Sequence, residues 1–146
     1  RILEVLIMAS QLHIYFGNVT AGMRDGTEAS SGTELSPISV TLDASQSEAK
    51  AVKCAVRCDT GYYIEGNTTI TKIGANAAKW KVAEDNSYAD AAAALANATW
   101  LDTITLANVD SYNVIFWVKA MSDSTESPQN DTSVDLQAEG LVVAEA

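Results

Sequence analysis

The sequence has little of what catalytic and metal sites are usually built from. Its 146 residues include one histidine, His13, and two cysteines. A nucleophile needs a base within hydrogen-bond reach, and zinc sites draw mainly on cysteine and histidine. His13 lies within an apolar run, which is typical of a half-buried strand residue. The sequence also contains no Gly-rich phosphate loop, Gly-x-Ser-x-Gly elbow or His-Glu-x-x-His helix. We therefore predict a protein that is not an enzyme and has no catalytic, cofactor-binding or metal-binding residue.

Positive charge is also scarce. Nine lysines and arginines stand against nineteen acidic residues, which gives a formal net charge of −10. Such a surface repels the phosphates of nucleic acids and of anionic membranes. The most apolar run, Ile2 to Phe16, is too short to span a bilayer. The expected partners are therefore copies of the chain itself, other subunits of a larger assembly, or a surface glycan.

The two cysteines lie in an alternating run. Val52, Cys54, Val56 and Cys58 share one face if residues 52–58 form a strand, and the charged residues point to the other face. Positions 54 and 58 would then be about 13 Å apart, beyond the reach of a disulfide. In a helix their Cα atoms would lie about 6 Å apart, where a strained disulfide is conceivable. The alternation favours a strand with two buried free thiols.

The same alternation is strongest between Asn113 and Ala138. Two runs, 114–120 and 134–138, are joined by an acidic loop rich in turn residues. This pattern is typical of an antiparallel hairpin with one buried face. Since the even positions of the first run face the core, Ile115 and Trp117 are predicted to form an outward contact surface.

Other segments indicate a sandwich of short strands with one helix. The alanine-rich segment from Tyr88 to Asn97 has good helix propensity, and Ser87 is a suitable N-cap. The strand patterns lie between turn signals at the spacing expected of a β-sandwich. These further strands are predicted at residues 38–42, 51–58, 62–64, 68–73, 79–82, 100–106 and 141–144, with a turn at 65–67.

The chain divides into three parts. Residues 1–21 form an apolar arm or the first strands, available to pair with a neighbouring subunit. Their periodicity fits a helix or strands, and the β-branched and aromatic content favours strands. Residues 22–37 are rich in acids, Gly, Ser and Thr and are expected to form an exposed loop. Residues 38–146 form the sandwich.

Two modification or ligand sites are left open by the sequence. The loop from Asp123 to Asp131 has the oxygen ligands that calcium prefers, but its spacing matches no EF-hand, and a solvated loop is the favoured interpretation. Asn-x-Ser/Thr sequons in expected turns suit an extracellular protein if the source organism glycosylates. These sequons begin at Asn18, Asn67, Asn97 and Asn130.

The order of the motifs resembles bacterial immunoglobulin-like domains, which are appended to tailed-phage virion proteins and prokaryotic surface proteins. The resemblance covers about residues 70–138. It depends on Trp80, then Trp100-Leu-Asp-Thr-Ile-Thr-Leu, Asn113-Val-Ile-Phe-Trp-Val-Lys-Ala, and Thr132-Ser-Val-Asp-Leu. The alanine-rich insertion and the N-terminal arm depart from the family pattern.

This resemblance implies an immunoglobulin-like antiparallel β-sandwich with a structural or adhesive role. We expect a structural subunit or decoration protein of a virion or extracellular filament, located on the virion surface or outside the cell. It would assemble through β-strand and apolar surface contacts. The alternative is a carbohydrate- or host-surface-binding module that uses Trp117 and nearby tyrosines.

Overall fold

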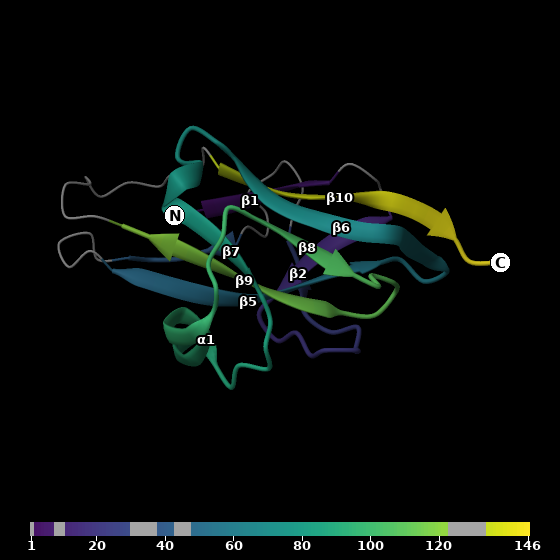
Figure 1. The fold of residues 1–146 in the computed structure, drawn as a ribbon, viewed down its shortest axis with the longest axis horizontal. Helices are drawn as coiled ribbons and strands as arrows, with labels where there is room; N and C mark the ends of the chain where they lie inside the picture. The colour runs from purple at the N-terminus through teal and green to yellow at the C-terminus, as the bar shows by residue number, and fades with distance from the viewer. Residues whose placement is uncertain (1, 8–10, 30–37, 43–47, 123–133) are drawn as a thin grey trace.

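Two β-sheets pack face to face in the computed structural model, which describes residues 2–7, 11–29, 38–42, 48–122 and 134–146 (Figure 1). Sheet A has the strand order β4 (Ile38–Ser39), β1 (Ile2–Ile7), β10 (Val134–Ala144), β6 (Tyr62–Gly74) and β8 (Thr103–Ala107). Sheet B has the order β3 (Thr27–Glu28), β2 (Leu12–Phe16), β5 (Ala49–Cys58), β9 (Val114–Met121) and β7 (Trp80–Glu84). The predicted all-β sandwich is confirmed.

The apolar N-terminal residues form strands that belong to different sheets. Strand β1 lies parallel to β10 and also pairs with β4, whereas β2 lies antiparallel to β5 with Ile14 opposite Val56. The favoured strand interpretation is therefore confirmed. In this arrangement, β1 and β2 each have a partner on both sides within the chain. Of the expected loop at 22–37, residues 27–28 form β3, and residues 30–37 lie outside the described part.

The hairpin predicted between Asn113 and Ala138 is wrong. Strand β9 pairs with β5 and β7 in sheet B, whereas β10 pairs with β6 and β1 in sheet A. Alternation identifies the faces of a strand but not the strand that will pair with it. Because β9 is apolar on both faces, an interior position in a sheet covered on both sides buries more apolar surface than a hairpin open to water.

The core lies between the sheets and explains the two cysteines. Cys54 and Cys58 are both buried and free, as predicted, and they face the core with Val56 between them. Burial raises the pKa of the Cys54 thiol far above its ordinary value and that of Cys58 to about 11. Both side chains therefore remain neutral thiols and act as small apolar residues.

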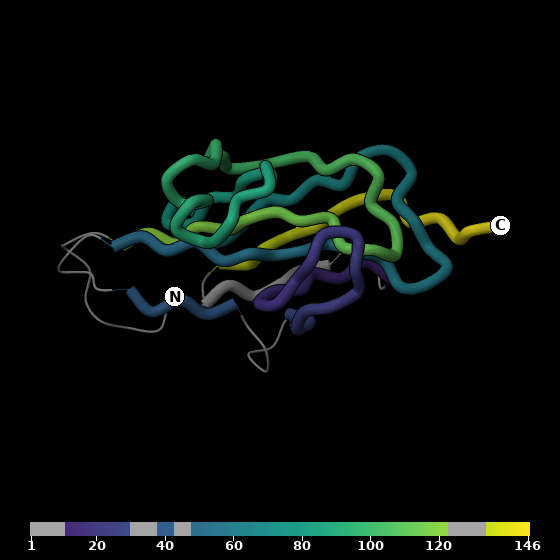
Figure 2. Tube along the Cα trace, turned by 90° about the horizontal axis from the view of Figure 1, so that it is seen from below, coloured from purple at the N-terminus to yellow at the C-terminus, as the bar shows by residue number. Residues whose placement is uncertain are grey.

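The outer face of sheet B is covered in two places. Helix α1 (Ala91–Asn97) lies over one end, and Ala94 packs against Trp117 and Ala83. The loop at residues 17–26 lies over the other end (Figures 1 and 2), where Val19 packs against Ile115. The side chains of Ile115 and Trp117 are only 6% and 2% exposed, so the predicted outward surface is wrong.

Helix α1 begins later than predicted. Its N-cap is Asp90, whose carboxylate accepts a hydrogen bond from the Ala93 N–H at 2.8 Å. Ser87 has a φ of 55° and lies in the irregular segment between β7 and the helix instead of capping the helix. An aspartate immediately before four alanines caps as well as a serine, and tertiary packing decides where the helix starts.

Strand β6 continues through the predicted turn at 65–67. Both halves of β6 pair with β10, and the register shifts between Glu139 and Leu141. Gly140 occupies this irregularity, and a Cβ there would lie only 2.8 Å from Ile64 Cγ2. The Glu65-Gly66-Asn67 segment is therefore part of a β-bulge rather than a hairpin turn.

Candidate functional site

Strand β8 is the least protected sheet edge in the described part of the chain. Its one ladder partner is β6, and the strand is five residues long, with backbone groups that point alternately to β6 and to the outer side. The edge strands β3 and β4 have two residues each. Strand β7 carries Lys81 and Glu84, and backbone bonds of 2.8 Å in both directions link Val82 to Leu101. Strand β8 has neither charge nor proline, the devices that usually block pairing with another chain.

The faces of β8 differ. Ile104 and Leu106 are buried in the core, whereas Thr103 and Thr105 lie on the exposed outer face of sheet A. The Thr103 and Thr71 hydroxyls are 2.9 Å apart and form a hydrogen bond between neighbouring strands. Hydroxyls that bond across the ladder hold β8 in register and leave its outer backbone edge available.

The charge beside β8 is internally balanced. Asp102, immediately before the strand, accepts hydrogen bonds from Lys72 at 2.8 Å and Lys81 at 2.6 Å through the same oxygen. These two ammonium groups lower the pKa of Asp102 to about 2. In a chain of net charge −10, the acid that directly precedes this strand is thus paired with two cations.

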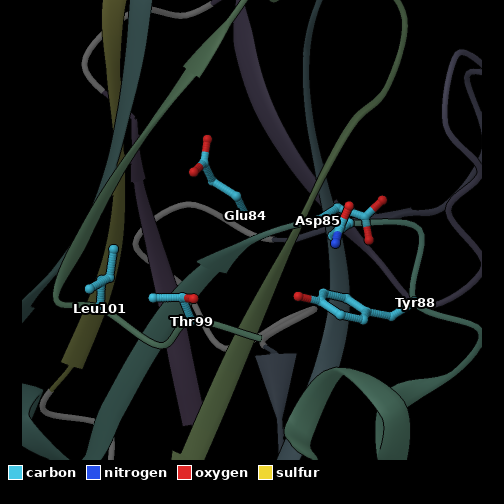
Figure 3. Close-up of a pocket in the computed structure, with 6 residues that line it drawn as sticks. Glu84, Asp85, Tyr88, Thr99 and Leu101 are labelled. Carbon is cyan, nitrogen blue, oxygen red and sulfur yellow. The ribbon is translucent and has the colours of Figure 1, made fainter. Parts of the chain in front are cut away.

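A pocket lies next to this edge, where the chain leaves β7 and returns toward β8. Its volume is about 420 Å³. Figure 3 shows side chains that surround the opening, with the Tyr88 hydroxyl on the side where Thr99 lies. The pocket is lined by Glu84, Asp85, Asn86, Tyr88, Thr99 and Leu101. It therefore combines oxygen-bearing side chains with one aromatic and one aliphatic side chain.

Trp117 supports this pocket from beneath. Its indole Nε1–H donates a 2.9 Å hydrogen bond to Asp85 Oδ1. The Tyr88 ring meets the Trp117 ring edge to face, with centroids 6.3 Å apart and an interplanar angle of 73°. One buried indole therefore positions two residues of the pocket. Sequence reasoning identified Trp117 but missed Asp85 and Tyr88, although the polar run after β7 was a visible turn signal.

The alternative carbohydrate-binding role would need an exposed Trp117, which the structure does not provide. Trp80 and Trp117 are buried. Trp100 is half-buried: its Nε1–H donates to the Leu95 carbonyl at 3.3 Å, and Lys119 Nζ lies 5.1 Å from its ring centroid. Burial and the neighbouring Lys81 lower the pKa of Lys119. Trp100 thus ties the end of α1 to sheet B.

His13 has a structural position at the opposite end of sheet B. Its Nδ1 lies 2.6 Å from Glu28 Oε1, and its Nε2 lies 3.0 Å from Asp59 Oδ1. The side chain is half-buried on β2, as predicted. Because both ring nitrogens contact carboxylates, the imidazole links β3 to the turn after β5.

The loop at residues 17–26 is held by a polar network around Asn113. The buried Asn113 side chain donates to Asp25 Oδ1 at 2.8 Å and accepts from Arg57 Nη1 at 2.7 Å. Hydrogen bonds from Thr20 to the Asp25 carboxylate lower the pKa of Asp25. Arg57 also lies over the Tyr15 ring, 3.5 Å from its centroid. These contacts connect the loop to Tyr15 of β2, to Arg57 of β5 and to the residue that precedes β9.

The structure describes three of the four predicted sequons but not the candidate calcium loop. Asn18, Asn67 and Asn97 are exposed. Asn130 and the loop from Asp123 to Asp131 lie outside the described residues. Across residues 2–7, 11–29, 38–42, 48–122 and 134–146, no group of three or more His, Cys, Asp or Glu side chains could hold a metal ion. No helix in these ranges is long and apolar enough to cross a membrane.

Within the described residues, the fold is an all-β sandwich in which α1 and the loop at residues 17–26 cover parts of sheet B, and a small polar pocket lies near the edge strand β8. No protein-family model, curated protein or solved structure matches the chain.

Proposed function

We propose that the protein is a non-enzymatic structural subunit that assembles with copies of itself through the outer edge of β8. The supporting observation is the contrast among the four sheet edges, because β8 alone is both five residues long and uncharged within the described strands. Unpaired backbone N–H and C=O groups on such an edge are satisfied when a second strand is added.

Antiparallel pairing about a two-fold axis at Thr105 fits the sequence of this edge. It places Thr103 opposite Ala107 of the second copy and Ile104 opposite Leu106. Asp102 then faces Asn108 instead of another acid, and its own two lysines already balance its charge. Like charges would otherwise oppose contact between two chains of net charge −10.

The contact should be reversible in solution. Each backbone hydrogen bond contributes about 0.5–1.5 kcal/mol net, and each cross-strand side-chain pair about 0.2–1 kcal/mol. The ordering of interface side chains and the translational and rotational freedom that the two chains lose on association offset much of this gain. Leu101, which lies two residues before β8 and is 46% exposed, would add apolar area to the contact. Because a two-fold contact is closed at two copies, it would join the chains in pairs within a larger assembly.

Replacing Thr105 with lysine tests the proposal. In the two-fold pairing, this substitution brings two positive charges together at the axis, where they oppose association. Thr69→Lys is the matched control, because Thr69 is the β6 residue directly opposite Thr105 and lies one strand away from the edge. Sedimentation velocity over a wide concentration range should show association of the parent and of Thr69→Lys, and a monomer for Thr105→Lys. A parent that remains monomeric throughout, or equal association of all three proteins, would overturn the proposal.

The proposal also includes the location of this assembly. Exposed sequons at Asn18, Asn67 and Asn97 and the resemblance to phage and surface-protein domains support a virion surface or an extracellular filament. Mass measurement of the native particle that contains the chain tests this setting. A native mass equal to that of a single free chain would contradict it.

A further inference from the structure

We propose that a neutral saccharide binds in the pocket lined by Glu84, Asp85, Asn86, Tyr88, Thr99 and Leu101. Its volume of about 420 Å³ lies within the roughly 300–1,000 Å³ range of small-molecule sites. The inference does not depend on the proposed assembly, because the pocket is formed within one chain.

The lining is rich in hydrogen-bond acceptors. Glu84 and Asp85 are carboxylates that only accept when ionised, whereas Asn86, Thr99 and Tyr88 can both accept and donate. A ligand that fits this set must offer several O–H donors and some acceptors. Neighbouring hydroxyls of a sugar ring supply both, and hydrogen bonds to a carboxylate are stronger than neutral ones.

The apolar residues of the pocket suit the C–H groups of a sugar ring. Tyr88 and Leu101 contribute an aromatic and an aliphatic surface to the same opening (Figure 3). A pyranose ring has C–H groups as well as hydroxyls, so one ligand can satisfy both kinds of lining.

Part of the pocket is held in position before any ligand binds. Trp117 holds Asp85 through the 2.9 Å hydrogen bond to Oδ1, which leaves Oδ2 to accept from a ligand. The same indole supports the Tyr88 ring. The segment that returns toward β8 is fixed as well, since the backbone bonds between Val82 and Leu101 place Leu101 beside β7. Preorganisation of this kind reduces the entropy lost on binding.

The charge of the pocket selects against other ligands. Two carboxylates in a chain of net charge −10 repel uronic acids and other anionic sugars. Calcium requires six to eight oxygen ligands, whereas this pocket contains two carboxylates, one of which already binds the indole N–H. A neutral sugar is therefore the favoured ligand class.

The indole signal of Trp117 in a ¹⁵N–¹H correlation spectrum provides a local readout. Methyl glucoside, methyl mannoside and methyl galactoside are titrated separately, with methyl glucuronide as the charged counterpart of the glucoside. We expect at least one neutral glycoside to shift the Trp117 indole with a Kd of about 1 mM and to leave the buried Trp80 indole unchanged. Methyl glucuronide should cause no shift.

Two pocket variants test whether a shift of the Trp117 indole signal comes from sugar bound in the pocket or from an effect of the sugar on the whole protein. Asp85→Asn keeps an oxygen that can accept from Trp117 but removes the charge, so glycoside affinity should fall several-fold and discrimination against the glucuronide should weaken. Tyr88→Phe keeps the ring against Trp117 and removes the hydroxyl, and it should also weaken binding. Glu139→Gln, on the outer face of sheet A, is the control and should bind like the parent.

The proposal is overturned if no neutral glycoside shifts the Trp117 indole, or if the glucuronide binds as well as the glucoside. It is also overturned if calcium chloride shifts this signal and the glycosides do not. Association of the parent chain, measured separately by sedimentation, reports on the β8 edge alone. Failure of one proposal can thus be distinguished from failure of the other.

Discussion

Replacement of Trp117 and of Trp80 by phenylalanine should have different effects on stability. Both side chains are buried, at 2% and 1% exposure. Trp117 Nε1 donates to Asp85 at 2.9 Å, whereas Trp80 Nε1 is buried and has no hydrogen-bond partner within the described residues. The two substitutions remove the same atoms from one protein, so the difference between them isolates the indole hydrogen bond.

The magnitudes follow from these surroundings. Trp117→Phe loses a hydrogen bond to a carboxylate, about 1.5 kcal/mol because Asp85 is partly exposed, and leaves a cavity that costs about 1 kcal/mol. Trp80→Phe leaves a similar cavity but removes an unsatisfied donor whose burial costs about 1–3 kcal/mol. We expect a free-energy loss of about 2–3 kcal/mol for Trp117→Phe and about 0–1 kcal/mol, or a small gain, for Trp80→Phe.

Urea unfolding followed by far-ultraviolet circular dichroism measures both values without using tryptophan fluorescence. The difference in midpoint should be interpreted only if the m-values agree, because a changed m-value indicates a changed unfolded state. Equal losses for the two variants, or a larger loss for Trp80→Phe, would refute the assignment of the two indole environments. Trp117→Phe should also release Asp85 and so weaken any glycoside binding, which Trp80→Phe should not do.

Two further predictions concern the N-terminal strands and Asp102. Deleting residues 1–16 should leave an unfolded or aggregating chain, because β1 and β2 lie inside the two sheets; a folded deletion variant with sharp, dispersed amide signals would contradict this topology. The folded pKa of Asp102, about 2, lies below its ordinary value of 3.8, so its ion pairs contribute stability above about pH 4 that is lost as the pH falls toward 2. The pH dependence of urea midpoints between these values should be flatter for Asp102→Asn than for the parent, and identical slopes would count against the lysine contacts.

The alternation of apolar residues predicted much of the fold correctly because it depends on local geometry. Side chains along a strand point to opposite faces, so Cys54 and Cys58 could be placed on the core face and too far apart for a disulfide. The β-branched and aromatic content of residues 2–16 likewise favoured strands over a helix.

The candidate pocket could not be predicted from the sequence to the same extent. Asp85 and Tyr88 belong to one polar turn, but Thr99 and Leu101 return to the site only after α1, and the pairing of Val82 with Leu101 brings them back. Nothing in the spacing of these residues predicts that contact, because a bridge across an inserted helix depends on where the helix packs.

By itself, the sequence determined that the chain is an all-β protein, which side of most strands faces the core, and that both thiols are free. These properties depend on neighbours within a few residues. Only the tertiary structure decided that β9 and β10 belong to different sheets and that Trp117 is covered instead of exposed. Strand pairing and the burial of a second face depend on which distant segments compete for the same edge or surface. That competition is decided by the total area buried across the whole molecule.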